Sequence, residues 1–130
     1  MTDPNVAREA AKAEDNLPTT LKLASDAEAQ ATEWAAHLRS HPPANEGERQ
    51  HYRTKAAEFR RFQATRLAEM EKTARTVAEL LRRLDTAPGD DQVLILRKQL
   101  GSVLEGEAAT ARALASVLEV CLEIDGLTLA

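Results

Sequence analysis

The chain has 130 residues, enough for one domain that buries a modest hydrophobic core. Its hydrophobic fraction of 43% is carried mainly by alanine, leucine and valine, with only four aromatic residues, which suits closely packed helices better than a sandwich or barrel of strands. The net charge of −4 argues against a general binder of nucleic acid or of anionic membranes.

The sequence carries no recognisable targeting or membrane-spanning segment. Residues 1–12 lack the basic and apolar regions of a signal peptide, and no apolar run approaches the roughly 20 residues that span a bilayer. Cys121 is the single cysteine, so no internal disulfide can form and a reducing compartment is indicated. We therefore expect a cytoplasmic protein that does not enter a membrane.

The first predicted helix spans residues 4–40. Asp3 can cap its N-terminus, and Pro4 is tolerated at its first position. Apolar residues recur at steps of three and four as far as Leu38, with an interruption at Pro18. Because proline removes a backbone donor and crowds the preceding turn, the helix must kink or break there. The stripe resumes in phase after Pro18, which favours a kink but leaves two separate helices open.

The second predicted helix spans residues 45–85 and is the longest. The residue before a proline is pushed out of helical geometry, so Pro42 and Pro43 end the first helix and the second helix begins after them. At 1.5 Å per residue it would be roughly 60 Å long. The composition of residues 85–90, which include Pro88 and Gly89, predicts a tight turn at its end.

The third predicted helix spans residues 90–125, with Asp90 or Asp91 as its N-cap and Gly126 at its end. Its predicted core stripe contains Val93, Leu96, Leu100, Val103, Leu114, Val117, Cys121 and Ile124, interrupted at Glu107 and Thr110. Leu104, Ala111, Leu118 and Leu122 are predicted to widen this apolar face. Apolar residues over more than one stripe also suggest a second contact surface on this helix.

Short loops between long helices force neighbouring helices to run antiparallel. The sequence therefore predicts an all-α fold, an elongated antiparallel up-down-up bundle of three long helices, or of four if Pro18 separates two. We expect one domain over residues 1–130.

The charges are segregated along the chain. Residues 1–48 contain four basic and nine acidic residues, residues 49–83 ten and four, and residues 84–130 three and eight. A cationic middle helix between two anionic ones favours charge pairing within the bundle or with a protein partner. The alternative is a nucleic-acid-binding face formed by Arg61, Lys72, Arg75 and Arg82, although no aromatic residues are interleaved with them for base stacking.

A polar layer is predicted at the middle of the bundle. Gln63 and Arg66 interrupt the seam of the second helix, and folding the chain back brings Glu107 and Thr20 to the same height. An Arg66–Glu107 pair with Gln63 and Thr20 as partners would fix the register of the helices. The alternative interpretation of this layer is a ligand-sized gap or a docking point for a partner.

The three histidines surround the first hairpin. Glu48 and His51 are three residues apart on one predicted helix, and His37 and His41 end the other. The spacing of Glu48 and His51 is the one that di-iron helical bundles use, and zinc is the other metal that such ligands suit. A metal site at His37, Glu48 and His51 is thus one hypothesis, and solvated histidines with no cofactor are the other.

No reaction motif is evident in the sequence, since it has no glycine-rich phosphate loop and no serine-nucleophile motif. The leading hypothesis is a non-enzymatic helical bundle that acts through protein–protein contacts as a scaffold, adaptor or assembly subunit. Its expected partner is another protein or a second copy of itself, with a homodimer as the expected form. The alternatives are a small metal- or ligand-binding bundle and nucleic-acid binding through the arginine-rich middle helix.

Overall fold

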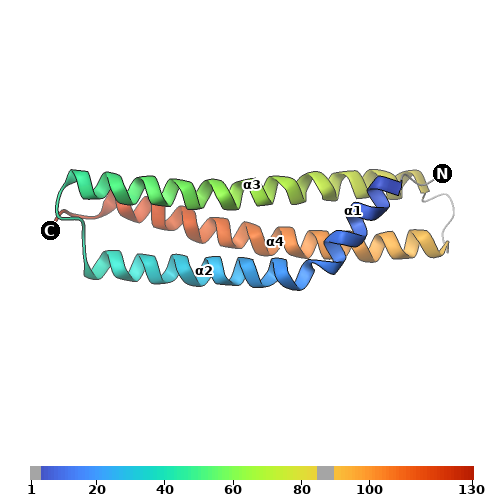
Figure 1. The fold of residues 1–130 in the computed structure, drawn as a ribbon, viewed down its shortest axis with the longest axis horizontal. Coiled ribbons are helices and arrows are strands. Elements are labelled where there is room, and N and C mark those ends of the chain that lie inside the picture. The colour runs from blue at the N-terminus through green and yellow to red at the C-terminus, as the bar shows by residue number, and fades with distance from the viewer. Residues whose placement is uncertain (1–3, 85–89) are drawn as a thin grey trace.

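The computed structural model describes residues 4–84 and 90–130 and confirms the all-α fold. In these two ranges the chain forms four helices: α1 (Pro4–Asp15), α2 (Leu17–Ser40), α3 (Glu46–Leu84) and α4 (Asp91–Gly126). Helices α2, α3 and α4 run up, down and up along an elongated bundle, and α1 crosses it near one end (Figure 1). None of the helices within these ranges has the length and apolar character needed to cross a bilayer.

Side-chain caps fix the start of the two longest helices. Asn45 caps α3, because its Oδ1 accepts a hydrogen bond from the Glu48 N–H at 2.9 Å. Asp90 caps α4 in the same way, accepting from the Gln92 N–H at 2.8 Å. Each cap satisfies a backbone donor that the first turn of a helix would otherwise leave unpaired. The capping role predicted for Asp90 is confirmed.

The C-terminus of α4 differs by one residue from the prediction. The helix includes Gly126 and ends in extended backbone at Leu127. Two other predicted features, the cap at Asp3 and the turn over residues 85–89, lie outside the described residues.

The first predicted helix is broken, and the break lies at Asn16, two residues before Pro18. Pro18 therefore sits in the first turn of α2, where a missing N–H removes no bond that the helix needs. Backbone hydrogen bonds of 2.9 Å still run from the Asn16 N–H to the Lys12 carbonyl and from the Thr20 N–H to the Asn16 carbonyl. The break lets α1 leave the line of α2 and cross α4 toward α3 (Figure 1).

Helix α4 lies at the centre of the arrangement, and each of the other three helices packs against it. In the described part of the chain the backbones of α2 and α3 do not approach each other closely. Larger side chains, among them Trp34 and Phe59, reach into the core that the three long helices share. Helix α4 is therefore buried on two faces, one toward α2 and one toward α3.

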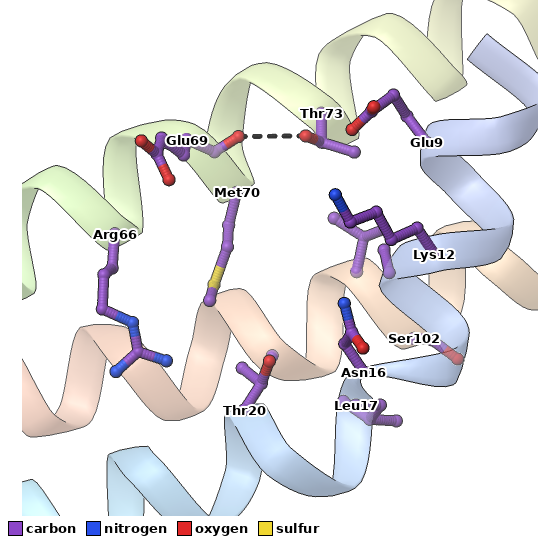
Figure 2. A pocket seen from close by; sticks show the side chains of 13 residues that line it. Glu9, Lys12, Asn16, Leu17, Thr20, Arg66, Glu69, Met70, Thr73 and Ser102 are labelled. Atoms are coloured by element: carbon purple, nitrogen blue, oxygen red, sulfur yellow. Dashed lines mark hydrogen bonds between the residues drawn. The ribbon is translucent and has the colours of Figure 1, made fainter. Parts of the chain in front are cut away.

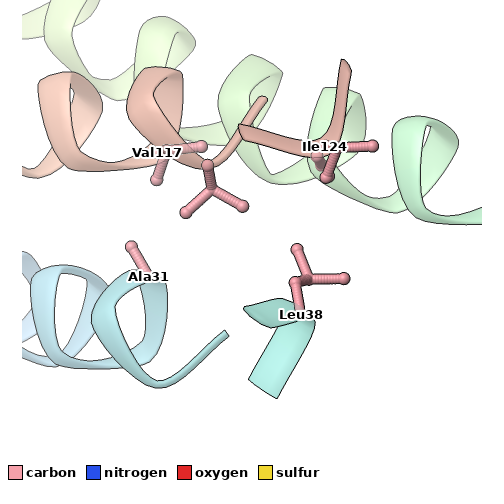
Figure 3. Packing of buried hydrophobic residues seen from close by; sticks show 6 residues of the cluster. Ala31, Leu38, Val117 and Ile124 are labelled. Atoms are coloured by element: carbon pink, nitrogen blue, oxygen red, sulfur yellow. The ribbon is translucent and has the colours of Figure 1, made fainter. Parts of the chain in front are cut away.

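Small side chains let α2 lie close to α4. We call the end of the bundle that carries the α2–α3 loop the closed end. Near it, Ala31 and Leu38 of α2 point toward Val117 and Ile124 of α4, and all four are buried (Figure 3). Further along, with Leu21 and Phe59 packed against them, the buried residues of the contact are alanines: Ala24, Ala27, Ala109 and Ala113. Interiors pack at the density of organic crystals, so alanine against alanine requires the two helix axes to approach closely.

Helix α1 covers the part of the bundle that α2 does not reach. Ala10 is fully buried against Val77 and Leu80 of α3 and Leu96 of α4. Val6 packs at the edge of the same cluster. The short α1 thus completes the core at the end of the bundle opposite to the α2–α3 loop.

Ion pairs join the helices at the closed end. Arg39 of α2 lies 2.5 Å from Glu123 of α4, and Arg53 of α3 lies 2.6 Å from Asp125 of α4. Glu123 is 21% exposed and the other three side chains 40% or more, and pairs at the surface contribute roughly 0–1 kcal/mol each, so they orient the helices more than they stabilise them.

The Arg49 guanidinium also joins helices at this end, and its side chain is only 12% exposed. It donates to the carbonyl oxygens of Asp125, at 3.3 Å, and of Leu127. A cation at the C-terminus of a helix satisfies unpaired carbonyls and interacts favourably with the helix dipole. The Ala130 N–H also donates to the Pro43 carbonyl at 2.9 Å, which ties the end of the chain to the loop.

Gly106 makes room for the start of α2. A Cβ atom at this position would lie 3.2 Å from Thr20 Cγ2 and 3.7 Å from Leu17 Cδ1. The glycine is buried in the middle of α4, where it lowers helix propensity by about 1 kcal/mol relative to alanine. Close packing of the two helices therefore explains this residue better than backbone freedom does.

We expect Gly106→Leu to lower the free energy of unfolding by about 1–3 kcal/mol, because a large side chain must displace Leu17 and Thr20. Gly106→Ala is the graded control and should stay within about 1 kcal/mol of the wild type, since its higher helix propensity offsets a small shift of Thr20. Urea unfolding followed by circular dichroism measures both. Equal stability of the leucine and alanine variants would contradict this account of the glycine.

Candidate functional site

The polar residues predicted to share one layer do not form one cluster. Thr20 and Arg66 border a hollow of about 210 Å³ that is lined by α1, the start of α2, α3 and α4 (Figure 2). Glu107 borders a different hollow, with Glu71 and Arg75, between α3 and α4. The expected Arg66–Glu107 ion pair does not form among the described residues, because α4 turns Glu107 away from α1 and α2.

Arg66 and Gln63 instead have separate surroundings. The Arg66 guanidinium lies 5.9 Å from the centre of the exposed Phe62 ring, as in a cation–π contact. Gln63 is buried at 2% exposure, and its Oε1 has no hydrogen-bond partner in the described part of the chain. Two polar interruptions of the same seam thus point in different directions and do not act together.

The hollow beside α1 is lined by side chains of both charges. Lys12 and Arg66 lie on its rim together with Glu9 and Glu69 (Figure 2). The nearest buried polar contact is a hydrogen bond of 3.4 Å from the Thr110 hydroxyl to the Met70 sulfur. Because the charges of the rim balance and the hollow opens to solvent, it offers no preference for an anion or for a cation.

The histidines lie close to the first loop but do not form a ligand set. The His37 and His41 rings stack at 4.8 Å, and His51 lies beside Tyr52 at 6.1 Å. Glu48 accepts a long hydrogen bond from the Tyr52 hydroxyl at 3.4 Å. Over residues 4–84 and 90–130, no three histidine, cysteine or acidic side chains are grouped so as to hold a metal ion. The arrangement predicted for His37, Glu48 and His51 therefore does not occur.

The four residues of the predicted basic face are all exposed on α3: Arg61, Lys72, Arg75 and Arg82. Acidic side chains interrupt this face. Arg82 pairs with Glu79 one turn away, and Arg75 shares its hollow with Glu71 and Glu107. The positive charge is therefore partly neutralised where a phosphate backbone would have to bind.

A long stripe of small and apolar residues, interrupted by Arg97, is exposed on the outer side of α4, opposite the faces that pack on α2 and α3. We call it the outer seam. Its residues follow alternating steps of three and four, and all of them are exposed: Leu94, Arg97, Gly101, Leu104, Ala108, Ala111, Ala115, Leu118 and Leu122. This is the heptad spacing by which one helix packs lengthwise on another.

The outer seam carries large apolar side chains as well as small ones. Leu94, Leu104 and Leu122 are 53%, 49% and 72% exposed. Complete burial of a leucine side chain is favourable by about 1.5–3 kcal/mol, so water contact at these positions is unfavourable relative to a packed state. The seam extends over about 42 Å of helix, far more than the scattered apolar residues of an ordinary surface.

The predicted core face of α4 requires a correction that reveals this surface. None of the four residues predicted to widen the core does so, since Leu104, Ala111, Leu118 and Leu122 are all exposed; Leu104 also borders the α3–α4 hollow. The additional core positions are instead Gln99, Gly106, Ala109, Ala113 and Val120. A second stripe of three- and four-residue steps was the available signal, although the sequence alone could not show that it faces outward.

No protein-family model matches the chain, and neither the curated proteins nor the solved structures contain a significantly similar chain.

Cys121 borders the core near the closed end and is half-buried. Burial raises the pKa of its thiol, and the charge of Arg60 offsets this only in part. The thiolate is the reactive form, so a raised pKa lowers the reactive fraction at neutral pH.

We therefore expect iodoacetamide to alkylate Cys121 more slowly in the folded protein than in urea at pH 8. The rate for the folded protein should still rise above pH 8.5, near which a free thiol is half ionised. Mass spectrometry of timed samples measures both rates, with the urea-unfolded chain as the control. Equal rates at pH 8 would show that the thiol is neither shielded nor shifted.

Proposed function

We propose that this protein is a non-enzymatic helical bundle that acts through protein–protein contact, with the outer seam of α4 as its contact surface. The role that this supports is that of a scaffold, adaptor or assembly subunit. The observation that carries the proposal is the exposed heptad stripe, because such a stripe is favourable only when another helix covers it. We also propose a cytoplasmic location, since Cys121, the only cysteine, suits a reducing compartment.

The surroundings of the seam support this role. Helices α2 and α3 pack against two sides of α4, so the seam lies on a helix whose position and conformation are fixed by packing. The Arg49 contacts and the ion pairs at Glu123 and Asp125 hold the C-terminal end of this helix. Because the seam is ordered before a partner arrives, binding loses little conformational entropy.

The sizes of the seam residues indicate a helical partner. Gly101, Ala108, Ala111 and Ala115 leave the α4 backbone approachable along the middle of the stripe. Leucines lie on both sides of this stretch and can project past a partner helix. An α-helix laid along the seam satisfies its own backbone hydrogen bonds and needs only side-chain packing to bind.

A photo-crosslinking amino acid at position 111 of the full-length chain tests the proposal in the native cells. We expect irradiation to give a discrete covalent adduct to another polypeptide, because Ala111 lies in the middle of the seam. The matched control places the same amino acid at position 61, since Arg61 is exposed on α3. Adducts from position 61 but none from positions 104, 111 and 118 would overturn the proposed contact surface.

A further inference from the structure

Four charged residues follow one edge of the outer seam. Lys98, Glu105, Arg112 and Glu119 are spaced seven residues apart, so they lie in one row, and their signs alternate. All four are exposed. Lys98 lies 4.0 Å from Glu14 of α1 and remains 81% exposed in that contact. Positions flanking a heptad seam are those that select a partner helix and its direction.

The two middle charges have no counterpart in their own helix. The residues three and four positions from Glu105 and Arg112 are glycine, alanine or serine, so neither has a neighbour for an intrahelical ion pair. Within the ranges that the structure describes, neither side chain takes part in an ion pair or hydrogen bond with another element. Their alternation therefore serves no contact inside the bundle.

The alternation is complementary to itself when the helix is reversed. In an antiparallel pair of α4 helices related by a two-fold axis, Lys98 faces the partner's Glu119 and Glu105 faces the partner's Arg112. The symmetry repeats both contacts, which gives four ion pairs of opposite charge. A parallel pair brings this row against the opposite edge of the seam, where Leu100, Glu107, Leu114 and Cys121 offer no such pattern.

Side-chain sizes select the same direction. Antiparallel layers place Gly101 opposite the partner's Leu118, Leu104 opposite the partner's Ala115, and Ala108 opposite the partner's Ala111. A large residue meets a small one in the first two of these layers, and the third brings two alanines together, so the two axes can keep a nearly constant separation over this stretch. A parallel pair would stack each residue on its own copy, so three alanine layers would adjoin two leucine layers and the helices would have to splay.

The position of the axis agrees with the length of the helix. The three side-chain layers are centred between Ala109 and Thr110, one residue or about 1.5 Å along the helix from the centre of the two charge pairs, which lies between Ala108 and Ala109. This point is also the midpoint of α4, which runs from Asp91 to Gly126. Two copies paired about it overlap along the whole helix and leave no part of the seam uncovered.

We infer that the occupant of the outer seam is a second copy of this chain, with the two α4 helices packed antiparallel about a two-fold axis beside Ala108. This inference rests on the proposed function and names its partner. The resulting homodimer is a rod about as long as one protomer, and it carries one α2–α3 loop at each end. Such a rod presents the same loop at its two ends, facing opposite directions.

Sedimentation analysis of charge-reversed full-length variants tests both the partner and the direction. We expect the wild type to be dimeric, and Glu105→Arg or Arg112→Glu to weaken the dimer by about tenfold or more, because symmetry applies each reversal twice. An equimolar mixture of the two variants should recover the dimer as a heterodimer, since every pair then has opposite signs. The double variant Glu105→Arg with Arg112→Glu should also be dimeric.

The controls are Glu33→Arg and Arg61→Glu, which reverse exposed charges on α2 and α3 and should leave the dimer intact. Circular dichroism verifies that each variant keeps the helical fold. A monomeric wild type at the highest attainable concentration would overturn the second copy as partner. Failure of the mixture to associate would overturn the antiparallel direction.

The contact surface and the identity of its occupant are tested separately. A monomeric wild type together with a position-111 adduct to a different polypeptide retains the proposed contact surface and rejects self-association. No adduct from any seam position in the native cells rejects the surface itself. An adduct with twice the mass of the chain supports both.

Discussion

The packing of α2 and α3 against two faces of α4 is the constraint on which the rest of the structure depends. The backbones of α2 and α3 do not approach each other closely in the described residues, so each buries most of its apolar stripe on α4. A helix that serves two neighbours needs an apolar arc wider than one stripe. Helix α4 meets this need with small residues toward the first part of α2, such as Ala109 and Ala113, and with leucines toward α3, such as Leu96 and Leu100.

The break at Asn16 follows from the same constraint. Helix α2 begins at Leu17, beside Gly106, and therefore covers only the later part of α4. A straight continuation of α2 would follow α4 without reaching α3, because the backbones of α2 and α3 do not approach each other. By crossing α4, helix α1 brings Ala10 onto Leu96 and Val77, so one short helix closes the core against two long ones. Pro18 adds little free-energy cost at this change of direction, because the first turn of a helix tolerates proline.

Local signals allowed most of the fold to be predicted from the sequence. Pro42, Pro43 and the cap at Asp90 each act over a few residues, and the structure has helix ends near each of them. The candidate site was harder to predict, because it depends on which stripe of α4 faces inward. Leu100 and Leu114 fit a core stripe as well as Gln99 and Ala113 do, and periodicity alone does not choose between stripes one residue apart.

The predicted polar layer failed for the same reason. Placing Glu107 opposite Arg66 assumed that Leu100, Glu107 and Leu114 form the centre of the buried face. The buried arc is centred instead near Gly106 and Ala113, since α4 is contacted from two directions. A rotation of one residue, about 100° of helix, moves Glu107 from the core to the edge of the α3–α4 contact. Small errors in phase therefore decide which polar residues can meet.

Helix propensity offers a simpler explanation for part of the outer seam, and the two explanations separate residue by residue. Alanine is the best helix former, so Ala108, Ala111 and Ala115 would be favourable on any exposed helix face. Propensity does not favour Gly101, which lowers the stability of an exposed helix. It also does not favour leucine over lysine or glutamate at a water-exposed position such as Leu122, because these residues form helices almost equally well. The leucines and the glycine, and not the alanines, are therefore the residues that indicate a covered surface.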